Sequence, residues 1–535
     1  ARLNGPQCEA VTGLGDPVCD GQAYLEWLGQ ANLFIVALDN QRQWYRYHHL
    51  FRQLLQNRLE RQADAGQLAD LHRRASAWYA RNGSVEDAIA HALHAGDEAA
   101  AVEIVEAHRH EAMNQERWQQ LEQWLRLMPR RLIDERPELL LLEAWLLAKQ
   151  WRIADLPPHL DRIEALLESV SSPEHNLSAL RGEVDALWCS VWYYTLNGER
   201  TYALASRALQ TLPLTYSSAR GIAWMYYGAG LQAMGDIQSA FDAIHDGLKE
   251  DLLHGNAFSS QLLIVLCVLH WIKGDLAGLN QTATHFLRLA EERHLVESLG
   301  WARYFRGCAA YQSNDLAAAE NDFAAVLELR YLTHGQPFSQ SAFGLASIYL
   351  AQGAGEQARA LVESVADYGL EVGNTRVLGD ARAFQAWLAL KQGRRAEAHR
   401  WAEGIDRNAP LVPMITFHVY AITLAEILLD RGTATSLLEA YHLLARLRSS
   451  LESQCNTRYA INVLALQALV ADALGDKPAA LQALQQAVTL AEPGGLLRVF
   501  VDLGPKMAEL LVRLNSQDVA GDWVDCILGA FPAGE

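Results

Sequence analysis

Several features that mark other protein classes are scarce in this chain of 535 residues. Its seven cysteines are an odd number without a Cys-x-x-Cys pair, which argues against a disulfide framework and predicts reduced thiols packed as small apolar groups. Only 15 residues are proline and half are apolar, which leaves little room for disorder. The longest unbroken apolar run, residues 262–269, is far short of the roughly 20 residues of a membrane span. We expect a folded cytoplasmic protein that has no membrane partner.

Signatures of catalysis and of nucleic-acid binding are also missing. The net charge is −18, from 45 basic and 63 acidic residues, which argues against binding to the phosphate backbone of a nucleic acid. No Gly-Lys dipeptide occurs, so a phosphate loop of the Gly-x-x-x-x-Gly-Lys type is excluded. No paired carboxylates and no Ser/His/Asp or Cys/His set can be argued from spacing. We expect no catalytic residue.

One short stretch resembles a metal cluster superficially. His108 and His110 flank Arg109, but two residues apart on a helix they point to different faces, whereas helical metal ligands need a spacing of four. The stretch therefore predicts a solvated helix face, and we expect no metal site.

What the sequence does contain is one helical turn repeated eight times. A Gly or Asn can adopt the left-handed backbone that closes a helix. Such residues recur at intervals of 37 to 43, at Gly198, Gly235, Gly274, Asn314, Gly353, Gly393, Gly432 and Gly475. A small or apolar side chain follows five residues later, at Ala203, Ala240, Leu279, Ala319, Ala358, Ala398, Leu437 and Ala480. The period predicts a mainly α fold, a TPR-like α-α superhelix whose units bury their apolar faces against their neighbours.

The beginning of the chain has a different pattern. An apolar run at 33–38, a polar turn at 39–42 and an aromatic return at 44–47 predict a β-hairpin. Helices expected at 24–31 and 49–61 flank it. Helix, hairpin and helix together are the outline of a small winged-helix segment, which no strongly basic stretch accompanies.

These differences in residue pattern predict four parts along the chain. Residues 1–62 form the winged-helix segment, and 63–169 a helical linker with first irregular repeats, in which Gly96 and Ala101 repeat the later pattern. Residues 170–492 form the TPR-like sensor domain, and 493–535 a cap with a helix at 506–515 that covers the end of the core. Because the chain begins on Ala1, we expect it to be part of a longer protein.

Five stretches carry a resemblance to a known family. Residues 32–39 and 44–51 resemble the winged-helix segment of the large ATP-dependent LuxR-type transcriptional activators, the MalT-like members of the STAND class. Residues 71–79, 86–93 and 497–504 extend the resemblance in the right order. It implies the inducer-sensing and autoregulatory region of a bacterial activator, without the upstream nucleotide-binding domain and the downstream helix-turn-helix domain.

The resemblance also implies cofactors and partners. A full-length relative binds ATP or ADP with Mg and hydrolyses ATP slowly, whereas this fragment needs no cofactor. In the implied mechanism ADP and the sensor arm stabilise a closed monomer, and a small-molecule inducer shifts the population towards a self-oligomer. Promoter DNA and RNA polymerase are contacted only through the missing domains.

Two sets of candidate binding residues follow. The resemblance implies that Arg46, His48 and His49 contact the bound nucleotide in the closed state; alternatively they only cap and pack the wing. Trp224, Arg303 and Arg382 share the position eleven residues before their turns, where rings and guanidinium groups could face an inner groove and bind an effector. Weaker effector candidates are Trp192, Tyr193, Tyr227 and Trp301.

The aromatic residues nine or ten positions before the turns have a simpler interpretation. An offset that recurs from repeat to repeat favours core packing, for Trp188, Tyr226, Tyr304, Phe343 and Phe384. Two other functions stay open: a TPR-type adaptor that binds a partner peptide, and an α/α-barrel enzyme, which the lack of Asp-rich metal boxes and paired acids disfavours. Sugars, aromatic and amphipathic metabolites all suit a groove with Trp, Tyr and Arg.

Overall fold

The structure, a computed structural model, describes residues 2–13, 20–31, 33–169, 177–253, 258–407, 409–516 and 521–532. Cys19, Asn32 and the boundary expected at residue 170 lie outside the described residues. The chain divides into two compact units, Ala1–Glu143 and Ala144–Glu535, and each has its own packing. The four predicted domain ranges stay predictions.

The first unit begins with the predicted winged-helix outline. Its elements are α1 (Gly5–Thr12), α2 (Gly21–Gln30), β1 (Ile35–Ala37), β2 (Tyr45–Tyr47) and α3 (His49–Gln62). The two strands pair antiparallel, with Ile35 opposite Tyr47, which confirms the hairpin. Leu25, Leu28, Ile35 and Tyr45 form a small buried core, because the helix face and the inward side of the hairpin are both apolar there.

Helical hairpins follow in the same unit. They are α4 (Ala65–Arg81), α5 (Val85–His94), α6 (Glu98–Asn114), α7 (Trp118–Leu127) and α8 (Arg130–Glu135). Gly96 has a φ of 71° and Ala101 is fully buried, as at the turns of the later repeats. The predicted solvated face around Arg109 is wrong. Arg109 and His110 are buried on α6, where Arg109 pairs with Glu106 at 2.5 Å, and burial lowers the pKa of His110 to about 2.

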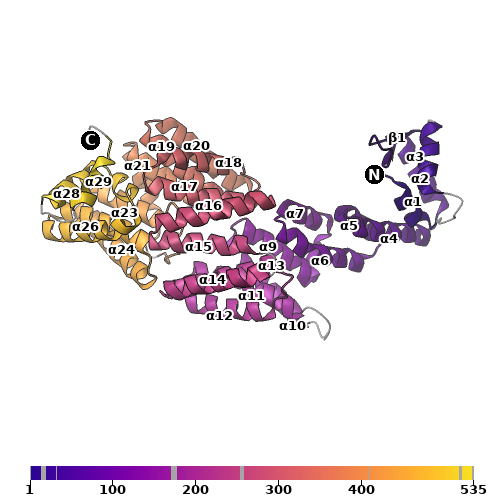
Figure 1. Ribbon diagram of the computed structural model, residues 1–535, viewed down its shortest axis with the longest axis horizontal. Coiled ribbons are helices and arrows are strands. Elements are labelled where there is room, and N and C mark those ends of the chain that lie inside the picture. Colours follow the sequence, from indigo (N-terminus) through magenta and orange to yellow (C-terminus); the bar gives the residue numbers. More distant parts are fainter. Residues whose placement is uncertain are drawn as a thin grey trace. The chain divides into compact units, whose positions relative to one another are not determined.

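The chain passes into the second unit through α9 (Pro137–Lys149), followed by η1 (Ile153–Asp155) and α10 (Leu156–Ser169). The long repeat region then runs through α11 (Leu177–Tyr194), α12 (Gly198–Thr211), α13 (Ser217–Ala233), α14 (Ile237–Leu253), α15 (Ser259–Lys273), α16 (Leu276–Arg293), α17 (Val296–Gln312), α18 (Leu316–Leu327), α19 (Gly335–Ala351), α20 (Gly355–Glu371), α21 (Thr375–Lys391), α22 (Arg395–Glu403), α23 (Tyr420–Arg431), α24 (Ala434–Ser453), α25 (Thr457–Ala473) and α26 (Lys477–Ala491). Each odd-numbered helix packs on the next helix and on the following odd-numbered one, so stacked pairs build a superhelix (Figure 1). The TPR-like fold is confirmed.

The turns inside the pairs explain the period. A residue with positive φ ends the first helix, and in five repeats the next residue is an Asn or Asp that caps the second helix through its side-chain oxygen: Asn197, Asp236, Asp275, Asp315 and Asp476. The residue five positions after the turn is buried against the first helix, as at Ala240 and Ala358.

The register of the first repeat was predicted wrongly. Its left-handed residue is Leu196, with a φ of 59°, and not Gly198, which already lies inside α12. Counted from Leu196, the buried position is Thr201, and Ala203 is exposed. The same displacement by two residues puts Leu187 in the core. Trp188 is half-buried, and its indole nitrogen donates to Glu164 at 3.1 Å.

Repeats far apart in the sequence also meet. Helix α15 packs against α25, although the four helix pairs from α17 to α24 lie between their repeats. The turns beside these helices touch as well: the Gln232 amide donates to the Gln454 carbonyl at 3.0 Å, and the Cys455 thiol donates to the Gly235 carbonyl at 3.2 Å. The superhelix therefore closes on itself over this stretch.

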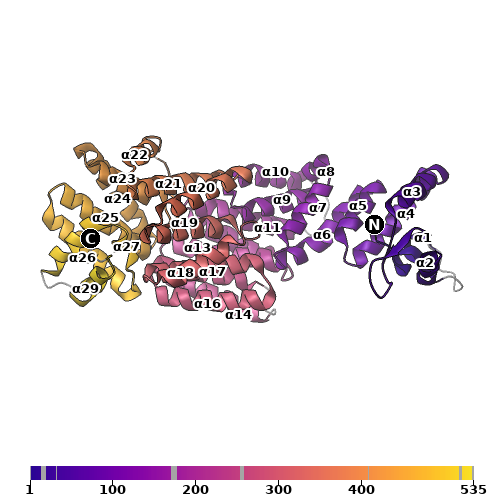
Figure 2. The same cartoon turned by 90° about the horizontal axis from the view of Figure 1, so that it is seen from above.

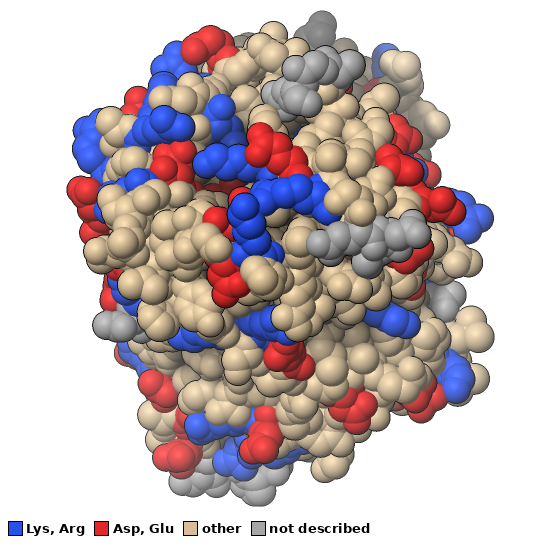
Figure 3. Space-filling model, turned by 90° about the vertical axis from the view of Figure 1, so that its left-hand side faces the viewer, with Lys and Arg blue, Asp and Glu red and all other residues tan. Residues whose placement is uncertain are grey.

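A group of short helices packs on the last repeat. It consists of η2 (Glu492–Gly494), α27 (Arg498–Val501), α28 (Pro505–Asn515) and α29 (Gly521–Gly529), beside α25 and α26 (Figure 2). Met507, Leu510, Leu511 and Leu514 of α28 are buried in the cluster of the last repeats. On the face of this end, acidic and basic side chains are interspersed in small groups (Figure 3).

Two exposed glycines allow a matched test of the turn geometry. Gly353 has a φ of 80° at a repeat turn, whereas Gly379 lies within α21, and an added Cβ would touch nothing within 4 Å at either site. We expect Gly353→Ala to lower the free energy of unfolding by about 1 kcal/mol, and Gly379→Ala to raise it by up to about 1 kcal/mol. Urea unfolding of both variants measures this; equal effects of the same sign would contradict the assigned backbone.

Candidate functional site

An extended stretch of the chain runs through the interior of the second unit. Residues 409–419, called here the inner segment, connect α22 to α23 without regular secondary structure. Helix α22 is short, and Pro410 and Pro413 keep the following backbone out of a helix. Met414, Ile415, Thr416 and Val419 are buried. The superhelix therefore has no open trough at this point, because its own chain fills it.

Side chains of several repeats hold the backbone of the inner segment. The Asn456 amide donates to the Met414 carbonyl at 2.9 Å, and the Tyr459 hydroxyl donates to the Thr416 carbonyl. The amide of Phe417 donates to the Tyr304 hydroxyl, and that of His418 to the Gln340 side chain, each at 2.9 Å. Recognition of main-chain groups by side chains is how an extended peptide is bound, so the interior is built to hold extended backbone.

The side chains of the inner segment pack against helices of several repeats. Phe417 packs on the rings of Tyr311 and Phe323, with ring centroids 5.0 and 5.8 Å away. The His418 ring lies against Phe343 and Phe384, at 5.7 and 4.9 Å. Ile415 belongs to a separate buried cluster with Tyr193 and Tyr226. The segment therefore contacts several buried clusters, which belong to early and to late repeats.

A cavity of about 80 Å³ lies beside the inner segment. Its wall is formed by Phe417, His418 and Val419 together with side chains of α17, α19, α21, α23, α25 and α27. Two buried arginines, Arg458 at the start of α25 and Arg498 at the start of α27, line it. Aromatic rings and two guanidinium groups thus converge from positions almost 200 residues apart.

The two arginines have different partners. Arg498 forms an ion pair with Asp502, which also accepts a hydrogen bond from the Tyr311 hydroxyl at 3.0 Å. Arg458 is 3% exposed and donates to Asn462, and its guanidinium carbon lies 4.8 Å from the ring centroid of Trp271. Burial lowers the pKa of Arg458. Its charge is supported mainly by rings and an amide.

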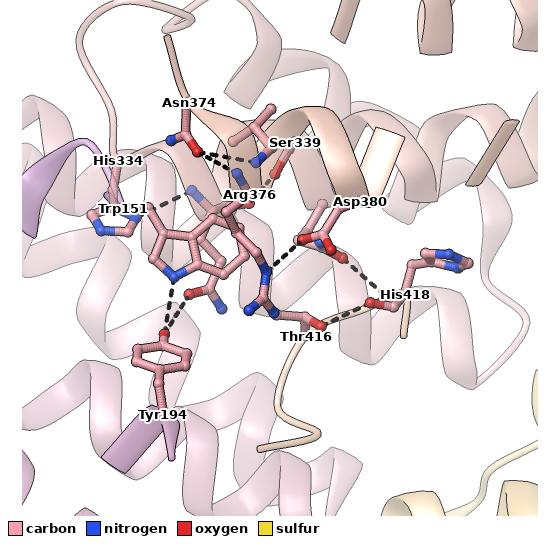
Figure 4. Close-up of polar contacts among 12 residues, drawn as sticks. Trp151, Tyr194, His334, Ser339, Asn374, Arg376, Asp380, Thr416 and His418 are labelled. Atoms are coloured by element: carbon pink, nitrogen blue, oxygen red, sulfur yellow. Dashed lines mark hydrogen bonds and ion pairs between the residues drawn. The ribbon is translucent and has the colours of Figure 1, made fainter. Parts of the chain in front are cut away.

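A second polar cluster lies beside the inner segment (Figure 4). The Trp151 indole donates to the Tyr194 hydroxyl at 3.1 Å, and Arg376 lies over the Trp151 ring, 4.9 Å from its centroid. Arg376 also pairs with Asp380 at 3.2 Å. Burial raises the pKa of Asp380, and Arg376 offsets part of that effect. Because this arginine already has a carboxylate, the cluster is electrically balanced.

The structure does not bring the seven predicted effector residues together. They lie on α11, α13, α17 and α21, and none is among the described residues that line the cavity. Trp192 has the Arg200 guanidinium 3.8 Å from its ring centroid, and Tyr193 is buried. The hydroxyl of Tyr227 lies 3.0 Å from that of Tyr202, and this hydrogen bond raises the pKa of Tyr227 to about 12.

The residues of the predicted polar column have separate surroundings. The ring of Trp224 packs towards Gly247 of α14, Arg303 lies 3.4 Å from Asp322 of α18, and Arg382 is exposed. Trp301 is buried, 5.2 Å from the His334 ring. Effector contact at these seven positions stays a prediction.

In the first unit, the predicted nucleotide contacts are accessible. Arg46, His48 and His49 are exposed at the end of β2 and the start of α3. The rings of His48 and His49 lie 4.4 Å apart, and the His48 side chain makes no capping hydrogen bond to α3. Their role at a nucleotide stays a prediction.

Comparison with known families decides the relationship. Residues 182–517 match the MalT-like TPR region, which is more than half of the chain, and residues 1–67 match the MalT winged helix domain. The chain belongs to the MalT-like family. In this MalT-like chain the matched TPR region contains the inner segment, the cavity and both cavity arginines.

Several solved structures are similar to this chain at low sequence identity. They include a Rap protein complexed with competence and sporulation factor, with 12% identity, TM-score 0.45, and coverage of 68% of this chain and 99% of that one. A STAND protein with a tetratricopeptide repeat sensor from Pyrococcus horikoshii has 11% identity and TM-score 0.46, and the match covers 75% of this chain and 60% of that one. Yeast Tom70 has 13% identity and TM-score 0.34, with 86% and 100% covered.

Three properties of the MalT-like chain concern its described parts only. Within them, no group of three or more His, Cys, Asp or Glu side chains is arranged to hold a metal ion. The helices that the structure describes include none with the length and apolarity to cross a membrane. The six described cysteines are free, and Cys189, Cys267 and Cys308 are buried.

Two interior histidines make the stability of the MalT-like chain depend on pH. Burial lowers the pKa of His418 to about 3 and that of His334 to about 4, below the value of about 6.5 expected when unfolded. Between these values the unfolded chain binds protons that the folded chain does not. We therefore expect the free energy of unfolding to fall as the pH falls below 6.5, by at most about 1.4 kcal/mol per pH unit for each ring. The loss is smaller to the extent that solvent reaches these half-buried rings.

Urea unfolding between pH 7.5 and pH 5 measures this slope. Because burial lowers the pKa of other histidines too, the contribution of the two rings is isolated by His418→Gln and His334→Gln. Each variant should flatten the slope. Variants that unfold with the slope of the unchanged chain would contradict neutral imidazoles at these two positions of the folded chain.

Proposed function

We propose that this chain is the inducer-sensing and autoregulatory region of a bacterial ATP-dependent transcriptional activator, and that a small-molecule effector binds inside the second unit. One observation carries the proposal. The cavity wall is built from α17 through α27 and from the inner segment, so a single bound molecule contacts repeats that are far apart in the sequence. A ligand in that position can favour one arrangement of the repeats over another.

The proposed mechanism is a population shift. Without effector, ADP on an upstream nucleotide-binding domain and this sensor region favour a closed monomer. An effector with higher affinity for the open arrangement shifts the population towards ATP-bound self-oligomers, which reach promoter DNA and RNA polymerase through a helix-turn-helix domain. The exposure of Arg46, His48 and His49 supports a contact of these side chains with the nucleotide in the closed state.

A thermal-unfolding screen of metabolites against this chain tests the proposal. An effector at a hundred times its dissociation constant should raise the free energy of unfolding by ~2.7 kcal/mol. Hydrogen exchange then locates the site, because the effector should slow exchange at the amides of Phe417 and His418 and of α27. Hits that leave these amides unchanged would argue against effector binding inside the second unit.

An adaptor function is the second candidate, and the inner segment is the observation that favours it. The interior already holds an extended peptide through side-chain to main-chain hydrogen bonds. A partner peptide could take the place of the inner segment. Pull-down of a stoichiometric protein partner, with no metabolite that stabilises the chain, would favour the adaptor.

A further inference from the structure

The charges around the cavity do not balance. Four charged side chains line it: Arg458, Arg498, Glu426 and Asp502. Asp502 is paired with Arg498, and Glu426 is paired with Lys391 at 2.7 Å from outside the lining. Both carboxylates therefore already have a cation, and Arg458 is the one cation of the described lining without an ion pair.

A buried guanidinium without a carboxylate is costly. Removing its charge from water is favourable only when hydrogen bonds and opposite charge replace the water. Arg458 is 3% exposed, and its Nε has no acceptor among the described residues; the Nε of Arg498, which is 7% exposed, has none either. The rings of Trp271 and Tyr459, with centroids 4.8 and 5.1 Å from the Arg458 guanidinium carbon, supply only part of the missing stabilisation.

The unused donors of the lining suit a group that accepts hydrogen bonds. They are the Nε atoms of Arg458 and Arg498, because the Tyr459 hydroxyl already donates to the Thr416 carbonyl and the Thr423 hydroxyl lies 3.3 Å from Nε2 of His418. Arginine presents a rigid fork of donors that matches the two oxygens of a carboxylate or of a phosphate. The volume of about 80 Å³ has room for such a group.

We propose that the cavity binds the oxyanion group, carboxylate or phosphate, of a small ligand through Arg458, with Arg498 as the second cation of the site. The ligand completes the charge that the protein leaves unpaired, and its remaining atoms lie against the rings of Phe384, Trp387 and Phe417. Because Phe417 and His418 form one wall, the bound anion also touches the inner segment.

This inference rests on the proposed function for its biological meaning, since it assigns a chemical class to the effector. Its test does not depend on regulation, because anion binding is measured directly on the chain. A neutral effector that acts elsewhere would leave the proposed function standing and the anion site refuted. Anion binding without any effect on the repeats would do the reverse.

The experiment uses sodium acetate and sodium phosphate as probes, at constant ionic strength against sodium chloride. We expect the midpoint of thermal unfolding to rise and saturate with acetate, with phosphate or with both, and the responding anion tells a carboxylate from a phosphate site. Acetamide, the neutral analogue of acetate, should have no effect. Arg458→Met should abolish the rise, whereas Arg395→Met, which removes an exposed arginine of α22, should retain it.

Arg458→Lys provides a second variant that keeps the positive charge but loses the donor fork. Its affinity for the responding anion, from isothermal titration, should be lower by about tenfold or more. Two results would overturn the proposal: no rise beyond that in chloride with either anion, or a rise that Arg458→Met retains. If Arg458→Met does not fold, unchanged anion affinity of Arg458→Lys overturns it.

Discussion

Phe417→Ala is expected to lower the free energy of unfolding by about 2–3 kcal/mol. The Phe417 ring packs against Tyr311 of α17 and Phe323 of α18, and truncation leaves a cavity at the meeting point of several repeats. The ring is half-buried, which places the effect below that of a fully buried phenylalanine. Urea unfolding of the second unit measures the change.

A matched surface variant controls for the loss of a large apolar side chain. Leu370 on α20 is 62% exposed, and Leu370→Ala should change the free energy of unfolding by less than about 0.5 kcal/mol. Hydrogen exchange adds a local measure, since Phe417→Ala should also speed exchange at the amide of His418, which is bonded to Gln340. A loss below about 1 kcal/mol with unchanged exchange would mean that the inner segment is only loosely held.

Gly344→Ala is expected to lower the free energy of unfolding by about 1–3 kcal/mol, although alanine normally favours a helix over glycine by about 1 kcal/mol. The buried Phe323 ring lies between two glycines of neighbouring first helices, Gly307 and Gly344. A Cβ on Gly344 would overlap that ring, and one on Gly307 would come within 2.7 Å of it. Phe417 also packs on this ring, with centroids 5.8 Å apart, which restricts its movement away from a new methyl group.

A double-mutant cycle tests this cause. Phe323→Leu removes part of the ring that the new methyl group would meet, so the double variant should be more stable than the sum of the two single effects, by about 1 kcal/mol or more. Unfolding free energies from urea titration of the four proteins give the coupling. Additive effects would show that Gly344 tolerates a side chain and that the contact with Phe323 is not limiting.

The repeat fold could be predicted from the sequence because its signal is local and repeated. Glycines with positive φ, such as Gly235 and Gly353, and a buried small residue five positions later recur at nearly constant spacing. The exception is instructive. Leu196 adopts the left-handed backbone without being glycine, so a turn assigned to Gly198 displaces the register of the first repeat by two residues. The pair Leu196-Asn197, which matches Gly235-Asp236, was the signal that would have placed the turn correctly.

The inner segment is harder to recognise in the sequence. The interval between Gly393 and Gly432 is the ordinary 39 residues, because the segment replaces parts of α22 and α23 and adds nothing to the length. Only Pro410 and Pro413 mark it, since two prolines three residues apart are incompatible with a continuous helix. Buried proline-marked stretches inside a regular repeat are therefore worth examining as candidate interior segments.

The cavity could not be predicted from spacing. Arg458 and Arg498 lie in different helices, and what makes them notable is which of them has a carboxylate partner. That depends on how α25 and α27 pack around the inner segment. Of the predicted effector residues, Trp224, Arg303 and Arg382 share one offset from their turns, but an offset fixes only the face of one helix. It does not fix which faces meet in the interior.

The contact between the turns at Gly235 and Cys455 restricts how this protein could change in evolution. Solenoids commonly gain or lose units by duplication or deletion, since each unit touches only its neighbours. Here an extra or missing hairpin anywhere between α14 and α24 would carry these two turns out of reach and separate α15 from α25. The closing contact thus requires a fixed number of hairpins. Descendants of this chain can therefore vary in residue type more freely than in the number of hairpins.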